Sequence, residues 1–154
     1  PEEHSAATWY YQISENYLCE PVQHYGFYLT PLQNFEKGKT VFYPHGYSNY
    51  FFHPTHPHEL IIVSTENNKV SILNCLSGEI VRTISKGKEY AFCNIDPVTG
   101  NYLFRNSYYV LITNENGDEL FRMRSEDASP YLANNILTCW AGAAINVEPY
   151  LKKP

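Results

Sequence analysis

The sequence predicts an all-β protein built from antiparallel four-stranded meanders. Aromatic residues make up 16% of the 154 residues, with 14 Tyr and 8 Phe, and these side chains favour the half-buried, pleated surface of a sheet. Short apolar runs alternate with turns that contain Gly, Pro or Asn, and no amphipathic pattern lasts for more than two helical turns. The third observation is a repeat, because Gly38, Gly78 and Gly117 are 40 and 39 residues apart and each lies between two apolar runs.

The first group of expected strands precedes the histidine-rich part of the chain. Pro21 should confine the second strand to an edge or a loop, because proline lacks a backbone N–H. A loop from Pro31 ends in the turn signal Lys37-Gly38. Strands are expected at residues 9–13, 17–19, 25–30 and 39–43.

The central group follows a loop that contains three histidines and two prolines, at residues 53–58. A polar turn over residues 65–68 and the turn Ser77-Gly78 separate its apolar runs. After a short strand that ends at Phe52, strands are expected at residues 60–64, 69–74 and 79–84.

The third group contains the strongest hairpin signal, Asn116-Gly117, since this dipeptide tolerates the positive φ of a tight turn. Asp96-Pro97 and Gly100 predict another turn. Strands are expected at residues 90–95, 101–104, 107–113 and 119–123. The apolar segments 132–140 and 143–147 are ambiguous between strand and other structure.

A repeat of about forty residues with four short strands is typical of a β-propeller blade. Val70–Asn74 aligns with Tyr109–Thr113 when the glycines are superimposed, and the apolar run Phe27–Thr30 also precedes Gly38. Pro54 recurs as Pro97, 43 residues later. We therefore expect one domain over residues 1–154, with approximate repeats at 9–43, 48–84 and 88–124 and a partial repeat at 130–150.

The segment from Phe52 to Ile84 resembles a blade of the WD-repeat family. Phe52-His53-Pro54 matches the strand end that opens such a blade, and Ser77-Gly78-Glu79 matches its last turn. Leu73-Asn74 stands where the family has Trp-Asp, so the resemblance is to a degenerate member. It implies a β-propeller fold and a non-catalytic role as a protein-interaction scaffold or as a subunit of a larger assembly.

Propellers close with about four to eight blades, whereas this sequence predicts about three and a half. We therefore expect an incomplete propeller, a fragment of a longer protein, or a propeller that a partner completes. An open blade exposes a strand edge, which other chains can pair with. The expected partner is another protein chain, or further copies of this one, that covers the open edges.

The histidine loop supports a competing hypothesis. His56 and His58 would share one face of an extended segment, and with His53 they form a possible set of metal ligands. The His-x-His pattern before a strand resembles the first motif of a cupin, which implies a small β-barrel or jelly roll and a metal-dependent enzyme or sensor. The structural alternative is an ordinary loop between two strands.

Composition and charge exclude several other functions. Apolar residues make up 44% of the chain and charged residues 18%, as in globular proteins. The net charge of −5 argues against binding to nucleic acid, and no apolar run is long enough to span a membrane. The sequence has neither a glycine-rich phosphate loop nor a Gly-x-Ser-x-Gly motif, so it supports no nucleotide cofactor and no serine hydrolase.

The four cysteines are far apart and form no Cys-x-x-Cys pair, which argues against a compact zinc site. We interpret them as buried thiols, with one or two disulfides as the alternative. The chain has no Asn-x-Ser/Thr sequon, and we expect it to be intracellular, either cytoplasmic or nuclear.

We conclude from the sequence that the chain is a non-catalytic interaction protein without a cofactor. Tyrosine offers a large, rigid contact area with a polar tip, and loops carry most contacts. A second alternative is a carbohydrate-binding propeller lectin, although Trp9 and Trp140 do not follow the repeat. The residues expected to make the contacts are His53, His56, His58, Tyr108, Tyr109, Asn114, Asn116 and Asp118.

Overall fold

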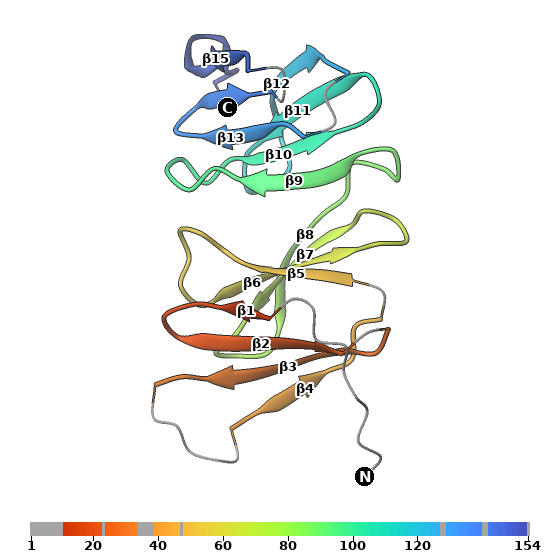
Figure 1. Cartoon of the computed structure of the whole chain (residues 1–154), viewed down its shortest axis with the longest axis vertical. Helices are drawn as coiled ribbons and strands as arrows, with labels where there is room; N and C mark the ends of the chain where they lie inside the picture. Colours follow the sequence, from red (N-terminus) through yellow and green to blue (C-terminus); the bar gives the residue numbers. More distant parts are fainter. Residues whose placement is uncertain are drawn as a thin grey trace. The chain divides into compact units, whose positions relative to one another are not determined.

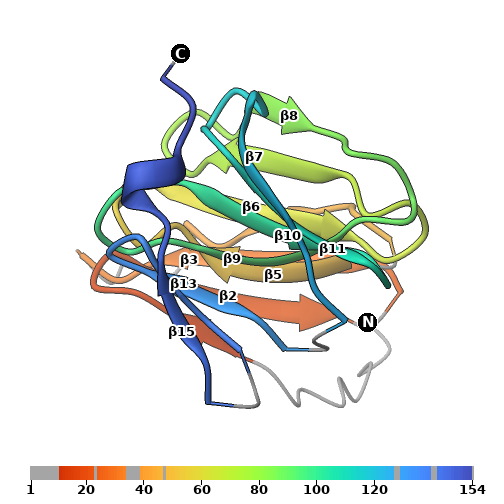
Figure 2. The same ribbon diagram turned by 90° about the horizontal axis from the view of Figure 1, so that it is seen from above.

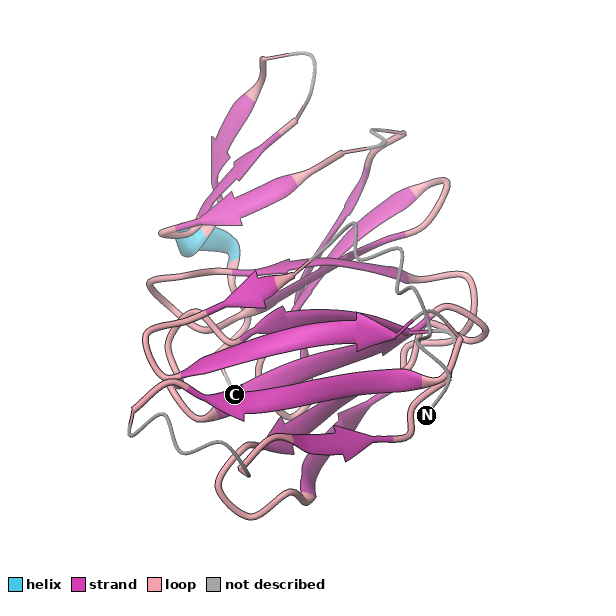
Figure 3. Ribbon diagram, turned by 60° about the horizontal axis from the view of Figure 1, so that its bottom comes forward, coloured by secondary structure: helices cyan, strands magenta, loops and turns pink. Residues whose placement is uncertain are grey.

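The computed structural model describes residues 11–22, 24–33, 39–46, 48–126, 129–139 and 142–153. In these residues the regular structure consists of β-strands and one short 3₁₀ turn, η1 (Glu148–Tyr150), which is cyan in Figure 3. None of the described segments forms a helix with the length and apolar character needed to cross a membrane. The predicted start of the first strand at residues 9 and 10, Gly38 and Trp140 lie outside the described residues.

The strands form four sheets, and in each sheet the spatial order of the strands follows the chain (Figure 1). The first sheet contains β1 (Gln12–Ile13), β2 (Tyr17–Val22), β3 (Gly26–Pro31) and β4 (Val41–Tyr43), and the second contains β5 (Ser48–Phe52), β6 (Glu59–Ser64), β7 (Val70–Asn74) and β8 (Ile80–Ile84). The third contains β9 (Ala91–Ile95), β10 (Tyr102–Arg105), β11 (Tyr109–Thr113) and β12 (Glu119–Arg124), and the fourth contains β13 (Tyr131–Ala133), β14 (Ile136–Thr138) and β15 (Ala144–Asn146).

These antiparallel meanders confirm the predicted all-β fold class of blade-like sheets. The ambiguous C-terminal region also folds as a meander, with three strands, and the chain then enters η1 directly after β15 (Figure 2). The chain divides into two compact units, residues 1–66 with 71–81 and residues 67–70 with 82–154. The expectation of a single domain stays a prediction.

The second strand differs from the prediction, because β2 continues through Pro21 to Val22 although it lies between β1 and β3. Among the described residues, β1 pairs only with Leu18 and Cys19. Beyond Cys19 no partner strand is described on that side of β2. Pro21 pairs with Phe27 of β3, so its missing N–H can face the other side, where no partner strand is described.

Each unit has its own apolar core. In the first unit, one face of the first sheet packs against the second sheet through Tyr17, Cys19, Phe27, Leu29, Tyr50, Leu60, Ile62 and Leu73. In the second unit, the third and fourth sheets pack together through Leu103, Val110, Ile112, Leu132, Leu137 and Val147. Successive side chains of a strand point to opposite faces, and each core takes one such set from each sheet.

The cores show that the alignment of Val70–Asn74 with Tyr109–Thr113 is wrong by one residue. That alignment pairs Leu73 with Ile112, yet Leu73 packs against the preceding sheet and Ile112 against the following one. A shift of one residue in a strand exchanges its two faces. The cause is turn length, because Gly78 donates to the carbonyl of Asn74, four residues earlier, whereas Gly117 donates to Asn114, three residues earlier.

Gly26, the first residue of β3, has no room for a side chain. Its φ of 149° is one that residues with a Cβ rarely adopt. A Cβ atom at this position would overlap the carbonyl oxygen of Tyr43 and lie 2.9 Å from the backbone nitrogen of His45. Backbone atoms cannot move aside as the end of a flexible side chain can, so only glycine fits where β3 passes the end of β4.

We expect Gly26→Ala to lower the free energy of unfolding by about 3 kcal/mol, because backbone strain and overpacking add. Gly142→Ala is the matched control, since Gly142 also has a positive φ but nothing within 4 Å of an added Cβ; we expect it to cost about 1 kcal/mol. Urea unfolding of both variants measures the difference. Equal costs would show that the contact with Tyr43 is unimportant.

Candidate functional site

The loop over residues 53–58 joins β5 to β6 and is closed by its own backbone. The N–H of His53 donates to the carbonyl of Glu59 at 3.0 Å, and the N–H of Glu59 donates to the carbonyl of His56 at 3.1 Å. His53 is buried, whereas Pro54 and Pro57 are exposed. The sequence predicted this loop, and the structure shows that His53 is its internal anchor.

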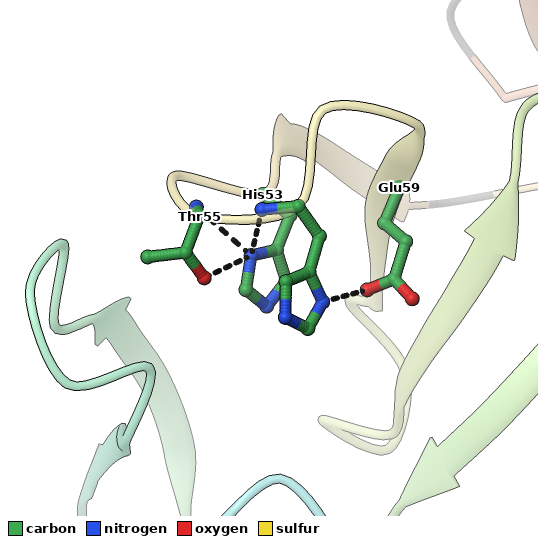
Figure 4. Close-up of polar contacts among 4 residues, drawn as sticks. His53, Thr55 and Glu59 are labelled. Atoms are coloured by element: carbon green, nitrogen blue, oxygen red, sulfur yellow. Dashed lines mark hydrogen bonds and ion pairs between the residues drawn. The ribbon is translucent and has the colours of Figure 1, made fainter.

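The imidazole of His53 accepts hydrogen bonds from the turn that follows it (Figure 4). Its Nδ1 lies 3.2 Å from each of three groups: the backbone nitrogens of Thr55 and His56 and the hydroxyl oxygen of Thr55. A ring nitrogen that accepts from backbone N–H groups carries no proton, so neutral His53 has its proton on Nε2. His53 therefore does for this turn what an Asn or Asp side chain does when it caps a helix or an Asx turn.

His56 stacks on His53, with the ring centroids 4.2 Å apart and the planes within 5° of parallel. The Nδ1 of His56 donates to Oε2 of Glu59 at 2.8 Å. The carboxylate thus fixes the orientation of the exposed ring, and the ring covers the buried one. Potential ligand atoms of His53, His56 and Glu59 all lie within 4.8 Å of one another.

The donor types of this cluster suit a transition metal, but its geometry does not. A nitrogen lone pair lies in the plane of its imidazole ring, so two parallel stacked rings cannot both direct lone pairs at one ion. A histidine that binds a metal also normally donates from its other ring nitrogen, whereas Nδ1 of His53 is an acceptor. Metal binding would require the stack to separate and His53 to release the turn.

His58, the third predicted ligand, is not part of this cluster. Its Nδ1 lies 2.9 Å from the hydroxyl of Tyr17, and the two rings meet edge to face. The carbonyl of His58 accepts from the N–H of Cys75 at 2.8 Å. His58 therefore connects β2, β6 and the turn after β7, which is a structural role.

The metal and capping interpretations predict different mutational patterns. We expect His53→Ala to lower the free energy of unfolding by about 2 kcal/mol, because two backbone N–H groups lose their acceptor. His53→Asn should recover at least about half of that loss, since an Asn oxygen can accept the same N–H groups. We expect His56→Ala, the matched control, to cost less than about 1 kcal/mol.

Chemical denaturation with and without Zn²⁺ measures these effects. A metal chelate would require both histidines equally, and Asn could not replace His53 in it. Stabilisation by Zn²⁺ that is lost in both His53→Asn and His56→Ala would contradict the capping interpretation.

Asp96 occupies the corresponding position 43 residues later, just before Pro97 and at the end of β9. Its carboxylate is fully buried, and Oδ1 accepts from the backbone N–H groups of Val98 at 2.9 Å and Thr99 at 3.3 Å. His53 and Asp96 therefore accept from the same two positions of their turns. The shared chemistry is a buried acceptor immediately before a proline.

Asp96 also binds the next sheet. Its Oδ1 accepts from the N–H of Asn134 at 2.8 Å and its Oδ2 from the N–H of Asn135 at 2.9 Å. These residues form the turn between β13 and β14. Two residues earlier, the Asn94 side chain accepts from the N–H of Leu132 at 3.1 Å and donates to its carbonyl at 2.9 Å. Asn94 and Asp96 thus hold the fourth sheet against the third.

Burial by itself would raise the pKa of Asp96, but the hydrogen bonds from Asn135, Val98, Asn134 and Thr99 outweigh it and hold this pKa below its usual value. A lowered pKa in the folded state means that the carboxylate stabilises the fold. This contribution is complete above the unfolded pKa of about 4. It is lost as the pH falls from there through the folded pKa.

We expect Asp96→Asn to lower the free energy of unfolding at pH 7 by about 2–4 kcal/mol, because the amide group of Asn would face backbone N–H donors. As the pH falls below about 4, the stability of the variant should also decrease less than that of the wild-type chain. Urea unfolding across the acid range measures both effects. The exposed Asp118→Asn is the control and should change stability by less than about 0.5 kcal/mol; an equal loss there would contradict the role of Asp96.

Tyr108 lies in the turn before β11 and Tyr109 is the first residue of that strand, which therefore begins two residues later than the predicted strand at 107–113. The backbone of both tyrosines is fixed. Oδ1 of Asn106 accepts from the N–H groups of both tyrosines, at 2.8 and 2.7 Å. The N–H of Ser125 donates to the carbonyl of Tyr108 at 2.8 Å. The side chains are 58% and 37% exposed. A rigid turn therefore presents two adjacent aromatic side chains to solvent.

Sequence reasoning missed the residues that surround this turn. The guanidinium of Arg122 lies 5.5 Å from the ring centre of Tyr109 and 5.7 Å from that of Tyr90, and it donates to the hydroxyl of Tyr90 at 2.6 Å. Two nitrogens of Arg122 also donate to the carboxylate of Glu119, at 3.1 and 3.0 Å. Tyr90 and Arg122 are 32 residues apart, and no sequence pattern links them.

Asn114, Asn116 and Asp118 lie at the opposite end of β11 from Tyr109, so the structure does not bring these two predicted contact groups together. Oδ1 of Asn114 accepts from the N–H groups of Asn116 and Asp118, at 3.0 and 2.9 Å. The amide of Asn114 donates to the carboxylate of Asp118 at 2.9 Å. The polar atoms of this turn therefore serve the hairpin itself.

None of the four cysteines forms a disulfide; Cys19 is buried, as expected, whereas Cys75, Cys93 and Cys139 are only partly buried. Burial raises the pKa of Cys19 and of Cys75 to about 12, helped for Cys75 by the negative charge of Glu59. Burial also raises the pKa of Cys93 to about 11, against the opposing effect of Arg105. These three thiols are protonated at neutral pH, so they are poor nucleophiles and poor metal ligands.

The described geometry resembles that of solved β-propeller-like proteins. No protein-family model and no curated protein matches the chain. BamB from Moraxella catarrhalis aligns with 82% of this chain and 38% of its own, with a TM-score of 0.57 and 16% identity. Hsv2 from Kluyveromyces lactis aligns with 83% of this chain and 38% of its own, with a TM-score of 0.52 and 10% identity.

The computationally designed protein Ika4 aligns with 94% of this chain and 92% of its own, with a TM-score of 0.61 and 12% identity. The chain spans about two fifths of the length of BamB and Hsv2. At these identities the likenesses show the fold alone, which is all-β and propeller-like. They do not show membership of the WD-repeat family.

Proposed function

We propose that this chain is a non-catalytic protein-interaction module, and that the turn carrying Tyr108 and Tyr109 makes its principal contact. The observation that carries the proposal is the rigid presentation of two exposed tyrosines by Asn106. Binding loses free energy when a flexible loop must be ordered. A turn that is already fixed avoids this cost.

The surroundings of the turn suit binding to a protein. Tyrosine and arginine are enriched among the residues that dominate binding energy at interfaces, and Arg122 lies against Tyr109. The charge of Arg122 is balanced by Glu119 at 3.0 Å, so a partner need not supply a carboxylate to it. The expected partner surface is therefore apolar or aromatic, with hydrogen-bond acceptors for the tyrosine hydroxyls.

Composition and fold support the same class of function. The chain is acidic, with a net charge of −5, which disfavours nucleic acid as the partner. The raised pKa values of Cys19, Cys75 and Cys93 keep these thiols protonated, so they are not activated for catalysis. Free cysteines also fit the reducing interior of a cell, so we propose an intracellular scaffold with a degenerate WD-like repeat.

The proposal is tested by capturing binding proteins from a cell lysate on the immobilised chain, followed by affinity measurement with each identified binder. We expect Tyr108→Ser/Tyr109→Ser to weaken binding by roughly tenfold or more, as for residues at the centre of an interface. Tyr25→Ser is the control, because Tyr25 is also an exposed turn tyrosine. Binders that both variants retain equally would refute the assignment of this surface.

A further inference from the structure

The first sheet has an outward face that the core of its unit does not use. Because side chains alternate along each strand, the register places two cross-strand rows on this face, Ile13–Leu18–Thr30 and Glu20–Tyr28–Phe42. Ile13, Tyr28 and Phe42 are 71%, 43% and 41% exposed. The face is therefore apolar and aromatic, and it is open to solvent.

The composition of this face is that of a surface made to pack against another sheet. The rings of Tyr28 and Phe42 lie against each other with centroids 5.0 Å apart. The face that the second sheet turns toward the first has the same character, with Tyr50, Leu60 and Ile62. In the described molecule, such a face is covered by the neighbouring blade-like sheet.

The fourth sheet has a corresponding outward face. Leu132, Leu137 and Ile145 form the row that packs toward the third sheet. The rows that alternate with it are Tyr131–Thr138–Ala144 and Ala133–Ile136–Asn146. The residues of these rows carry no charge, and the neighbours of the half-exposed Tyr131 include the small side chains of Thr138, Ala144 and Ala133, which leave room for the larger residues of the first sheet.

The two outward faces are complementary in direction as well as in size. In each described core, two consecutive sheets pack together: the face of the earlier sheet that is directed toward the later one meets the face of the later sheet that is directed toward the earlier one. The outward face of the fourth sheet corresponds to the face that an earlier sheet turns toward a later one. The outward face of the first sheet corresponds to the face that a later sheet turns toward an earlier one. Glu20 is the only charge in their rows, so no like charges meet.

We propose that the outward face of the first sheet docks on the outward face of the fourth sheet of a second copy of this chain. This is a heterologous contact, in which different patches meet. It continues the sheet-on-sheet packing of both cores and covers Tyr28, Phe42 and Ile13. The contact does not involve the Tyr108–Tyr109 turn, so it stands independently of the proposed function.

The test begins with the mass of the chain in solution, measured by light scattering after size-exclusion chromatography over a concentration series. We expect the wild-type mass to rise above the 17.8 kDa of one chain. Phe42→Lys and Tyr131→Lys should each weaken self-association at least tenfold. Leu76→Lys, which makes the same change at an exposed turn position, should not weaken it, and neither should Tyr108→Ser/Tyr109→Ser.

Mixing the two weakened variants distinguishes a heterologous contact from a symmetric one. Phe42→Lys retains an intact fourth sheet and Tyr131→Lys an intact first sheet, so the mixture should form a hetero-oligomer that neither variant forms alone. Failure of the mixture to associate, while the wild type associates, would overturn the assignment of the two faces. A wild-type chain that stays monomeric at all concentrations would overturn the proposal.

Hydrogen exchange of the wild-type chain gives a measurement that does not depend on variant stability. Amides of β3–β4 and of β13–β14 should exchange more slowly at high protein concentration than at low concentration. Amides of the turn at Asn114–Asp118 should not change. Unchanged exchange in both pairs of strands would also overturn the proposal.

Discussion

The blade-like sheets of this chain depend on buried acceptors that satisfy the backbone of their turns. Asp96 shows the principle most fully, because one carboxylate accepts four N–H groups from two turns in neighbouring sheets. Buried N–H groups without partners are costly. The carboxylate therefore fixes the ends of β9 and β13 together and sets where the third and fourth sheets can pack.

In the preceding sheet, the neutral imidazole ring of His53 is the acceptor for the backbone N–H groups of the turn. In both turns the next residue is proline, which has no N–H, so the N–H groups that need an acceptor come two and three residues after the acceptor. A carboxylate or an unprotonated imidazole nitrogen reaches both. This explains why Pro54 and Pro97 recur 43 residues apart while the residues before them differ in type.

The sequence was sufficient to predict the elements whose causes are local. Strands and turns follow from short apolar runs and from Gly, Asn and Pro, so most strands of the first three meanders were predicted nearly to their bounds, whereas the fourth meander was left ambiguous. The face of the sheet on which each side chain lies was not predicted correctly, because it depends on turns of different length after Asn74 and Asn114. Likewise, the described part of β1 begins only at Gln12, opposite Cys19, so it does not reach Pro21, and no local pattern reveals this.

For the candidate site, the sequence likewise indicated some of the residues but not the contacts that they make. The cluster of histidines was visible, but their partners were not: the Tyr17 bonded to His58 is 41 residues away, and the Tyr90 bonded to Arg122 is 32 residues away. Such contacts are set by packing of whole sheets. Even the contact between Glu59 and His56, which is local, gives no signal in the sequence, because it depends on the conformation of the loop between them.

Some polar side chains form hydrogen bonds to the backbone of their own turns, and this determines which other residues remain available for a partner. Asn74, Asn114 and His53 use their acceptor atoms to hold their own turns, so they have little left to offer another molecule. At the β10–β11 turn, Asn106 does this work for two residues at once. The backbone of Tyr108 and Tyr109 is thereby held in place by another side chain, and a fixed aromatic surface is what an interface requires.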